Sequence, residues 1–371
     1  MVRRLWPLLS LTMALLSGQR AKPVYDPETR DGLLIQHIEQ ETDPAQKLGY
    51  MEQFASAYPK HPAIAWVYDQ LQPAYFDAKS WDQVMRIGEL RLALEPENLQ
   101  AGELALRAAE ASHDASRILD WADRVWPLAN TLAGRGGANS AEARQTAGYA
   151  EFLAYSTAIG AADPRRRLEL LQNFEQHMPG SKYAATLTPE YFEIYQSLND
   201  EQKSIEMAEK GLEKDPQNAE MLMYLAEINA RKDDPHERQT VIAYTTRAVG
   251  ALERMPRPAS LSEDVWTRRK AALLTLANYL GGVSNSLNHN YSRADVMLRA
   301  AVAGMGENDP RLPAALYHLG MANYRLAEAG NNRSRPVDAL KFLRRCAEIS
   351  SPFQQQALKD VAGIKAEYSL P

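Results

Sequence analysis

The chain has 371 residues, which is enough for two or three compact domains or for one elongated array of repeats. Hydrophobic residues make up 45% of it and charged residues 24%, without an excess of glycine or proline, so the composition excludes a disordered or collagen-like chain. The net charge of −5 argues against a general nucleic-acid binder, because neutralising phosphates requires a basic surface.

The N-terminus has the pattern of a signal peptide over residues 1–21. Two arginines precede an apolar stretch, Leu5–Leu16, whose 12 residues are fewer than the roughly 20 that a membrane-spanning helix needs. Small residues follow, so we expect cleavage after Gln19 or Ala21. The pattern predicts an exported protein, periplasmic or secreted and typical of a bacterial envelope. The alternatives are a buried first helix or an uncleaved anchor, and such an anchor would be the chain's only contact with a membrane.

The mature chain is expected to be mildly acidic and without disulfides. Removing residues 1–21 takes away three of 42 basic residues and none of 47 acidic ones, so the net charge moves from −5 to −8. Cys346 is the single cysteine, so no intramolecular disulfide can form and stability must come from packing. Because Cys346 falls at a small-residue packing position, we expect a buried thiol rather than a reactive one.

An internal duplication with a spacing of 120 residues is the main feature of the sequence. The matched residues are those that start, end or pack helices: Asp43-Pro44 with Asp163-Pro164, Leu48 with Leu168, Phe54 with Phe174, Pro59 with Pro179, and Pro96 with Pro216. Aspartate caps a helix and proline suits its first turn, whereas a later proline ends a helix. We therefore expect the same order of helices in residues 43–98 and 163–218.

The rest of the pattern predicts helices throughout, with no run of alternating β-branched residues long enough for a strand. Prolines recur every fifteen to twenty residues as expected helix boundaries: Pro44, Pro59, Pro96, Pro127, Pro164, Pro179, Pro216, Pro235, Pro256, Pro310 and Pro352. After the signal peptide, the predicted regions are 22–132 (N-terminal repeats, 65–132 the clearest), 133–140 (a glycine-rich loop), 141–256 (the duplicated set) and 257–371 (C-terminal repeats).

Several segments resemble the tetratricopeptide repeat, a helix pair of about 34 residues that ends near a proline. The segments are 65–98 (Leu71, Tyr75, Trp81, Val84, Gly88, Pro96), 99–132 (Ala105, Leu106, Ala109, Ile118, Ala122, Val125) and 185–218 (Tyr191, Tyr195, Ser204, Ala208, Gly211, Pro216). A more degenerate match covers Leu316, Gly320 and Tyr324, followed by Ala339, Leu343 and Cys346. The resemblance implies an all-α fold, a right-handed α-solenoid of stacked antiparallel helix pairs.

The resemblance also implies a binding surface. In this family, ligands lie in a concave groove lined by the first helix of each pair. The corresponding positions hold Trp66, Asp69, Phe76, Asp77, Glu103, Arg107, Glu110, Glu193, Gln196, Glu227, Arg231, Tyr317, Tyr324 and Arg325. Aromatic side chains beside charges are typical of a peptide groove. The Lys/Asn clamp with which some family members hold a C-terminal carboxylate does not occur at these positions.

No constellation of residues in the sequence points to catalysis, a cofactor or a metal. The seven histidines are scattered and none forms an H-E-x-x-H pair. His113, Asp114 and Ser116 contain the three residue types of a hydrolase triad, but they are too close in sequence to orient one another, so we interpret Asp114 as a helix cap. The basic runs 165–167 and 268–270 lack interleaved aromatics and indicate solvated helix faces.

The sequence therefore predicts a non-catalytic, exported scaffold or adaptor that binds a protein or peptide in its groove, with no nucleic acid and no cofactor. The alternative is an accessory solenoid of a cell-wall enzyme system that grips glycan. Sugar sites need aromatics stacked beside paired carboxylates, which Trp66, Phe76, Asp69 and Asp77 would supply if they converged on one exposed cleft.

Overall fold

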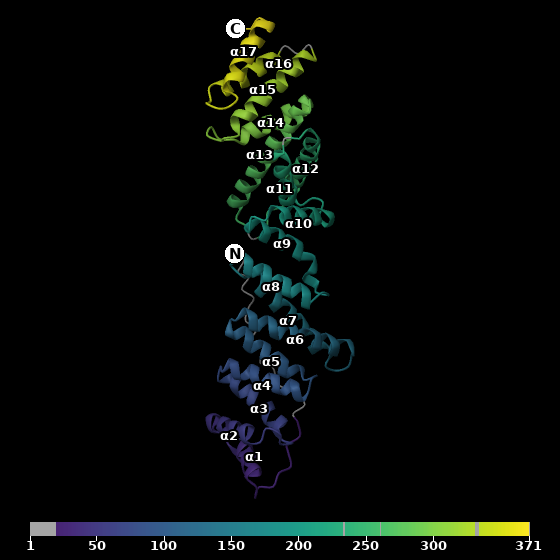
Figure 1. Ribbon diagram of the computed structural model, residues 1–371, viewed down its shortest axis with the longest axis vertical. Coiled ribbons are helices and arrows are strands. Elements are labelled where there is room, and N and C mark those ends of the chain that lie inside the picture. Colours follow the sequence, from purple (N-terminus) through teal and green to yellow (C-terminus); the bar gives the residue numbers. More distant parts are fainter. Residues whose placement is uncertain (1–19, 233, 260, 331–333, 371) are drawn as a thin grey trace. The chain divides into compact units, whose positions relative to one another are not determined.

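A computed structural model describes residues 20–232, 234–259, 261–330 and 334–370. The predicted signal peptide thus lies almost entirely outside the described residues. Within the described ranges the chain forms seventeen α-helices and one 3₁₀ helix, and no strand (Figure 1). The prediction of an all-α protein is confirmed. None of the helices in these ranges combines the length and the apolar character needed to cross a membrane.

The chain divides into two units between Glu190 and Tyr191. The helices that begin in the N-terminal unit are α1 (Arg30–Gln40), α2 (Pro44–Ala57), α3 (Ile64–Asp77), α4 (Trp81–Leu94), α5 (Leu99–Ser112), α6 (Ala115–Gly134), α7 (Ser140–Ile159), α8 (Pro164–His177), the 3₁₀ helix η1 (Lys182–Thr186) and α9 (Leu187–Ser197), which continues into the next unit. The C-terminal unit holds α10 (Glu201–Lys214), α11 (Ala219–Arg231), α12 (Pro235–Arg254), α13 (Glu263–Leu287), α14 (Tyr291–Gly304), α15 (Leu312–Glu328), α16 (Ser334–Ala347) and α17 (Gln354–Tyr368).

Short polar residues start most of these helices as the sequence indicates. The carboxylate of Asp43 accepts hydrogen bonds from two backbone N–H groups of the first turn of α2, and Asp163 caps α8 in the same way with one such bond. Asp114 accepts from the N–H groups of Ser116 and Arg117, so its interpretation as the cap of α6 is confirmed. His113, just before it, has a left-handed φ of 57° and ends α5.

Helix boundaries repeat at the spacing of 120 residues. Three helices of the first copy have counterparts with both ends shifted by that number: α2 with α8, α4 with α10, and α6 with α12. The left-handed residues that follow α3 and α9, Lys79 (φ 56°) and Asn199 (φ 57°), repeat at the same spacing. The repeat in helix boundaries therefore extends beyond the prolines at which the sequence match ends, to Gly134 and Arg254.

One helix departs from this repeat. The counterpart of α3 begins as the 3₁₀ helix η1 and becomes α-helical only at Leu187. Pro189 stands in the second copy where the first has Asp69. Proline lacks a backbone N–H and clashes with the carbonyl four residues earlier, so it is favoured in the first turn of an α-helix and costly in the interior. Pro189 thereby fixes a later start for α9.

The proline boundaries are confirmed with one exception. Pro127 was expected to end a helix but lies inside α6, which continues to Gly134. An interior proline costs roughly 3 kcal/mol. Packing offsets this cost, because Val125 and Ala129 are fully buried on either side of the proline and α6 contacts both α5 and α7. The predicted glycine-rich loop does follow, between α6 and α7.

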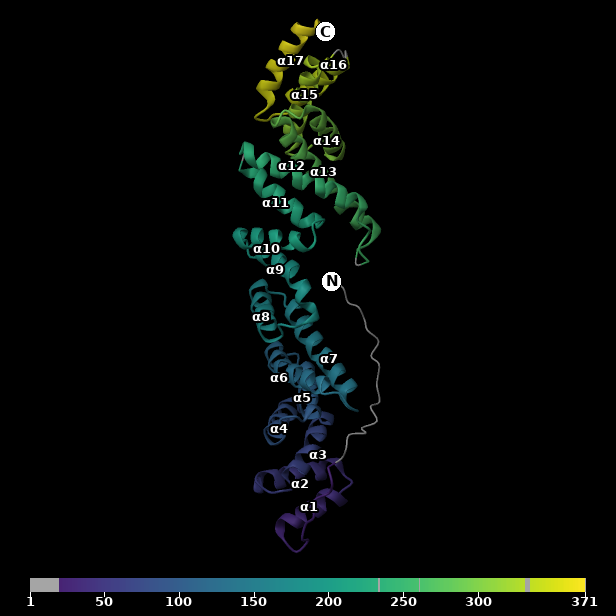
Figure 2. The ribbon, with the colours of Figure 1, turned by 90° about the vertical axis from the view of Figure 1, so that its right-hand side faces the viewer.

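Successive helices pack in pairs, and small residues stand where two helices approach most closely. A Cβ on Gly88 of α4 would lie 2.9 Å from the Cβ of Ala105, and one on Gly320 of α15 would lie 2.6 Å from Leu343. Alternate helices also touch: α3 contacts α5, α5 contacts α7, α11 contacts α13, α13 contacts α15, and α15 contacts α17. Figure 2 shows α13 extending past the helices beside it.

Candidate peptide-binding faces

We call the exposed sides of the first helices of the pairs the first-helix faces: α3, α5 and α7 in the N-terminal unit, and α9, α11, α13, α15 and α17 in the C-terminal unit. Fourteen sequence-predicted residues lie on these helices. The concave groove, the right-handed superhelix and the limits of the sequence regions remain predictions.

On the N-terminal unit, α5 and α7 bring one predicted cluster together. The guanidinium of Arg107 donates to Glu103 Oε1 from Nε (2.9 Å) and from Nη2 (2.7 Å), and lies 5.5 Å from the ring centre of Tyr149. Thr146 Oγ1 donates to the other oxygen of Glu103 at 2.8 Å, and the hydroxyl of Tyr149 donates to Glu110 at 2.5 Å. Both carboxylates of α5 thus bond to hydroxyls of α7.

This cluster keeps its charges. Burial lowers the pKa of Arg107, but hydrogen bonds and charge from Glu103 outweigh it, so the net direction is upward. Burial and the bond to Glu110 raise the pKa of Tyr149, so the phenol stays neutral and remains a donor. The side chain of Arg107 is 45% exposed, which presents a fixed cation to the solvent. Thr146 and Tyr149 were missed from the sequence because α7 has no clear repeat match.

The four predicted residues of α3 do not form one exposed cleft. Trp66 is 8% exposed, because α3 packs against α2, α4 and α5 and has buried residues on several sides. Phe76 is partly buried and its ring centre lies 5.2 Å from that of Trp81. Asp77 is exposed, whereas Asp69 is held in ion pairs with two arginines. Trp66 is therefore part of the core rather than a surface for stacking.

The C-terminal unit has a second cluster, between α15 and α17. Tyr317 donates to Asp360 at 3.1 Å and Tyr324 donates to Glu367 at 2.9 Å. Arg325 lies 5.4 Å from the ring centre of Tyr324 and pairs with Glu328 at 2.8 Å. Burial, and then the charge of Asp360, raise the pKa of Tyr317 to about 12.

The other predicted residues of this unit are charged or amide side chains on α9 and α11. Glu193, Gln196 and Glu227 are exposed. Arg231 pairs with Glu201 of α10 at 3.0 Å. The charges of Arg231 and Arg311 both act on the carboxylate of Glu227. Helix α11, which carries Glu227 and Arg231, contacts the first helix α13.

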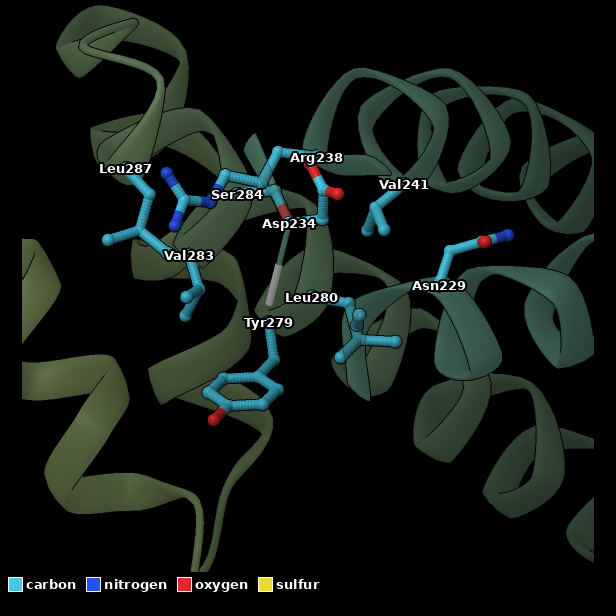
Figure 3. A pocket seen from close by; sticks show the side chains of 10 residues that line it. Asn229, Asp234, Arg238, Val241, Tyr279, Leu280, Val283, Ser284 and Leu287 are labelled. Carbon is cyan, nitrogen blue, oxygen red and sulfur yellow. The ribbon is translucent and has the colours of Figure 1, made fainter. Parts of the chain in front are cut away.

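A small cavity of about 120 Å³, which the sequence did not indicate, lies between α11, α12 and α13. Figure 3 shows Asp234 and Arg238 of α12 opposite Val283, Ser284 and Leu287 of α13. Asn229, Ala230, Val241, Tyr279 and Leu280 complete the lining. The cavity is too small for a drug-sized ligand, since such sites have roughly 300–1,000 Å³.

Metal or thiol chemistry has no support from the described residues. In the described ranges, no three His, Cys, Asp or Glu side chains gather closely enough to hold a metal ion. Cys346 is fully buried, as expected, and burial raises its pKa to about 11.

Successive helices of the described residues pack against one another in pairs. No protein-family model matches the sequence, and no curated protein matches it. Solved structures with the same type of helix pair match with low overlap. They include the tetratricopeptide domain of P58(IPK) (12% identity, 90% of this chain and 97% of that chain, TM-score 0.28), Cut9 with Hcn1 (12%, 90% and 64%, 0.33) and yeast Tom70 (13%, 93% and 66%, 0.31).

Proposed function

We propose that this protein is an exported scaffold that binds proteins or peptides on its first-helix faces. The observation that carries the proposal is the cluster of Glu103, Arg107, Glu110 and Tyr149. There, Glu103 holds the exposed guanidinium of Arg107, and hydrogen bonds from Thr146 and Tyr149 of α7 hold Glu103 and Glu110 of α5. A fixed cation beside an aromatic ring loses little entropy on binding and suits an acidic or aromatic partner segment.

The second cluster supports the same proposal from the C-terminal unit. Tyr324 and Arg325 combine an aromatic ring with an exposed charge, and Glu367 holds the phenol of Tyr324 from the neighbouring first helix. Interfaces are enriched in tyrosine and arginine, because both give large contact area together with polar groups. The proposal includes no catalytic step and no cofactor.

The glycan-binding alternative is supported less well. It requires aromatic side chains to stack on a sugar beside paired carboxylates, and the burial of Trp66 in α3 removes one of the two aromatics. We therefore keep protein or peptide binding as the proposed function.

A pull-down from envelope extract, followed by mass spectrometry, tests the proposal. The unchanged chain is compared with a chain carrying both Arg107→Gln and Arg325→Gln, because these changes remove exposed cations from both clusters. The proposal expects a specific protein that the variant captures less well. Equal capture by the two chains would place the binding surface elsewhere. N-terminal sequencing of the exported protein tests the localisation, and a start at Met1 would contradict cleavage of the signal segment.

A further inference from the structure

A polar network inside the N-terminal unit has no counterpart in the second copy. Gln72 of α3 is completely buried; its amide nitrogen donates to the carbonyls of Val84 (3.1 Å) and Ala101 (3.0 Å). Its amide oxygen accepts from Arg91 Nη1 at 2.6 Å, and Arg91 Nη2 pairs with Asp69 at 2.7 Å. In the second copy, 120 residues later, Phe192 occupies the position of Gln72 and Gly211 occupies the position of Arg91.

This difference indicates that the network has a purpose other than folding. The second copy forms the corresponding helices, α10 and the later-starting α9, with an aromatic ring and a glycine at the two positions. Burying a guanidinium costs several kcal/mol of desolvation, which an apolar pair avoids. The network holds the carboxylate of Asp69 in place, because its Oδ1 pairs with the guanidinium of Arg91, whose side chain is only 5% exposed.

The second carboxylate oxygen of Asp69 bonds to Arg20, the first of the described residues. Arg20 Nε donates to Asp69 Oδ2 at 3.0 Å, and Arg20 Nη2 bonds to Glu95 at the end of α4. Glu95 also accepts from Asn98 at 3.1 Å. The hydrogen bond from Arg20 is the main cause that lowers the pKa of Glu95. Without Arg20, two carboxylates would face one buried guanidinium.

We propose that Asp69 and Glu95 form a recognition site for an arginine side chain, and that segment 20–25 occupies it in a chain that retains Arg20. The planar guanidinium has several N–H donors in fixed directions, so it can bond to two carboxylates at once. The ammonium of a lysine is a compact charge and lacks this geometry. The segment makes two further contacts with a carboxylate: Tyr25 donates to Glu39 of α1 at 3.0 Å, and Lys22 pairs with Glu39 at 3.5 Å. The occupied site closes this part of α3 to other arginine-bearing segments.

The inference deepens the proposed function, because it names the chemistry of one segment that a first helix recognises. The contact itself needs no partner and is tested on the full chain, produced without export so that Arg20 is retained. Trypsin cuts after Arg20 only when the side chain leaves Asp69 and Glu95. We expect Glu95→Gln to speed the appearance of the product that begins at Ala21 by about threefold to tenfold, the range for a partly exposed ion pair.

Glu89→Gln is the matched control, because Glu89 is an exposed carboxylate on the same helix that pairs with Arg124 instead. It should leave the cleavage rate after Arg20 unchanged. High salt should reduce the difference in cleavage rate between Glu95→Gln and the parent, because salt screens exposed ion pairs. Equal rates for the parent and Glu95→Gln at low salt would overturn the proposal, whatever the pull-down shows for the first-helix faces.

A second measurement tests recognition of an external arginine. An N-acetylated peptide with the sequence of residues 20–26 is titrated calorimetrically into the full chain carrying Arg20→Gln, whose site is vacant. We expect binding to this chain, binding about threefold to tenfold weaker to the parent, and loss of binding when Glu95→Gln is added. No binding to the Arg20→Gln chain would overturn the recognition site.

Discussion

Arg91 donates a 2.6 Å hydrogen bond to the amide oxygen of Gln72, and both side chains lie inside the N-terminal unit. The second copy has Gly211 and Phe192 at these two positions and forms the corresponding pair of helices. Equivalent positions of the two copies therefore hold a polar pair in one case and an apolar pair in the other. Substitution can show how each pair affects the free energy of unfolding.

Exchanging the pair one residue at a time should be more harmful than exchanging both. Gln72→Phe alone leaves the Arg91 guanidinium without its amide partner, and Arg91→Gly alone leaves a cavity and an unpaired amide oxygen. A buried polar group left without its hydrogen-bond partner costs about 1–3 kcal/mol. The double variant removes both polar groups, so we expect a coupling free energy of about 1–3 kcal/mol in its favour. Urea unfolding of the four chains measures it, and additive effects would show that the two positions are independent.

The helix boundaries could be predicted from the sequence because they depend on local residues. Asp-Pro at Asp43 and Asp163 gives a cap and a first turn whatever surrounds it, and the same holds for the prolines that follow helices. The prediction that Pro127 ends a helix was wrong, because its outcome is not local. It depends on how Val125 and Ala129 pack against other helices, which a local sequence pattern does not contain.

The binding residues were less predictable. The helical pattern of the sequence gives the position of a residue on its helix, but it does not show which other helices pack against that position. Trp66 occupies a first-helix position and is nevertheless buried. The partners of Arg107 and Asp69, namely Tyr149 and Arg20, lie about 40 or more residues away in the sequence. A usable signal was present only for Gln72 and Arg91, where the 120-residue match changes from polar to apolar.

Stability should fall in mild acid because of His318. Burial lowers its pKa to about 4 from an ordinary value of 6.5, with the rings of Tyr317 and Phe353 nearby and Ser286 Oγ 3.3 Å from Nδ1. The unfolded chain therefore binds a proton between about pH 6.5 and 4 that the folded chain does not, so stability is complete above pH 6.5 and is lost as the pH falls. The loss amounts to roughly 3 kcal/mol at most.

Urea unfolding at pH 7 and pH 4.5 measures this loss. His318→Gln cannot take up the proton, so its stability should change less between the two pH values than that of the parent. His289→Gln, on the short connection between α13 and α14, is the control for removal of an exposed histidine and should behave as the parent does. An identical pH dependence in all three chains would mean that His318 does not contribute.

The thiol of Cys346 should be inert in the folded protein. Burial raises its pKa to about 11, and its Sγ lies 3.3 Å from the carbonyl oxygen of Pro313, so almost none of it is thiolate at pH 8. We expect a thiol reagent such as Ellman's reagent to react with it only after denaturant is added, with one equivalent per chain. Rapid reaction without denaturant would show that α15 and α16 open readily.

Binding and folding should be separable on the N-terminal unit. Arg107 is exposed, so Arg107→Gln should change the free energy of unfolding by less than about 1 kcal/mol, yet weaken a partner that contacts it by about 2 kcal/mol, or about thirtyfold. Arg124→Gln is the matched control, because Arg124 also pairs with a carboxylate (Glu89) and lies 5.0 Å from an aromatic ring (Trp121), but on α6 rather than on a first helix. It should leave both quantities nearly unchanged.

Leu71→Ala should do the opposite of Arg107→Gln. Leu71 is 1% exposed in the core of α3, so the cavity left by the substitution costs about 2–5 kcal/mol. Because repeat proteins couple mainly through neighbouring helix pairs, the loss should appear first as unfolding of α2 to α5, seen as faster hydrogen exchange there than in the C-terminal unit. Below the temperature at which α3 unfolds, binding should match the parent. If Arg107→Gln melts early, or binds the pulled-down partner as tightly as Arg124→Gln does, then the first-helix face of α5 is not the binding surface.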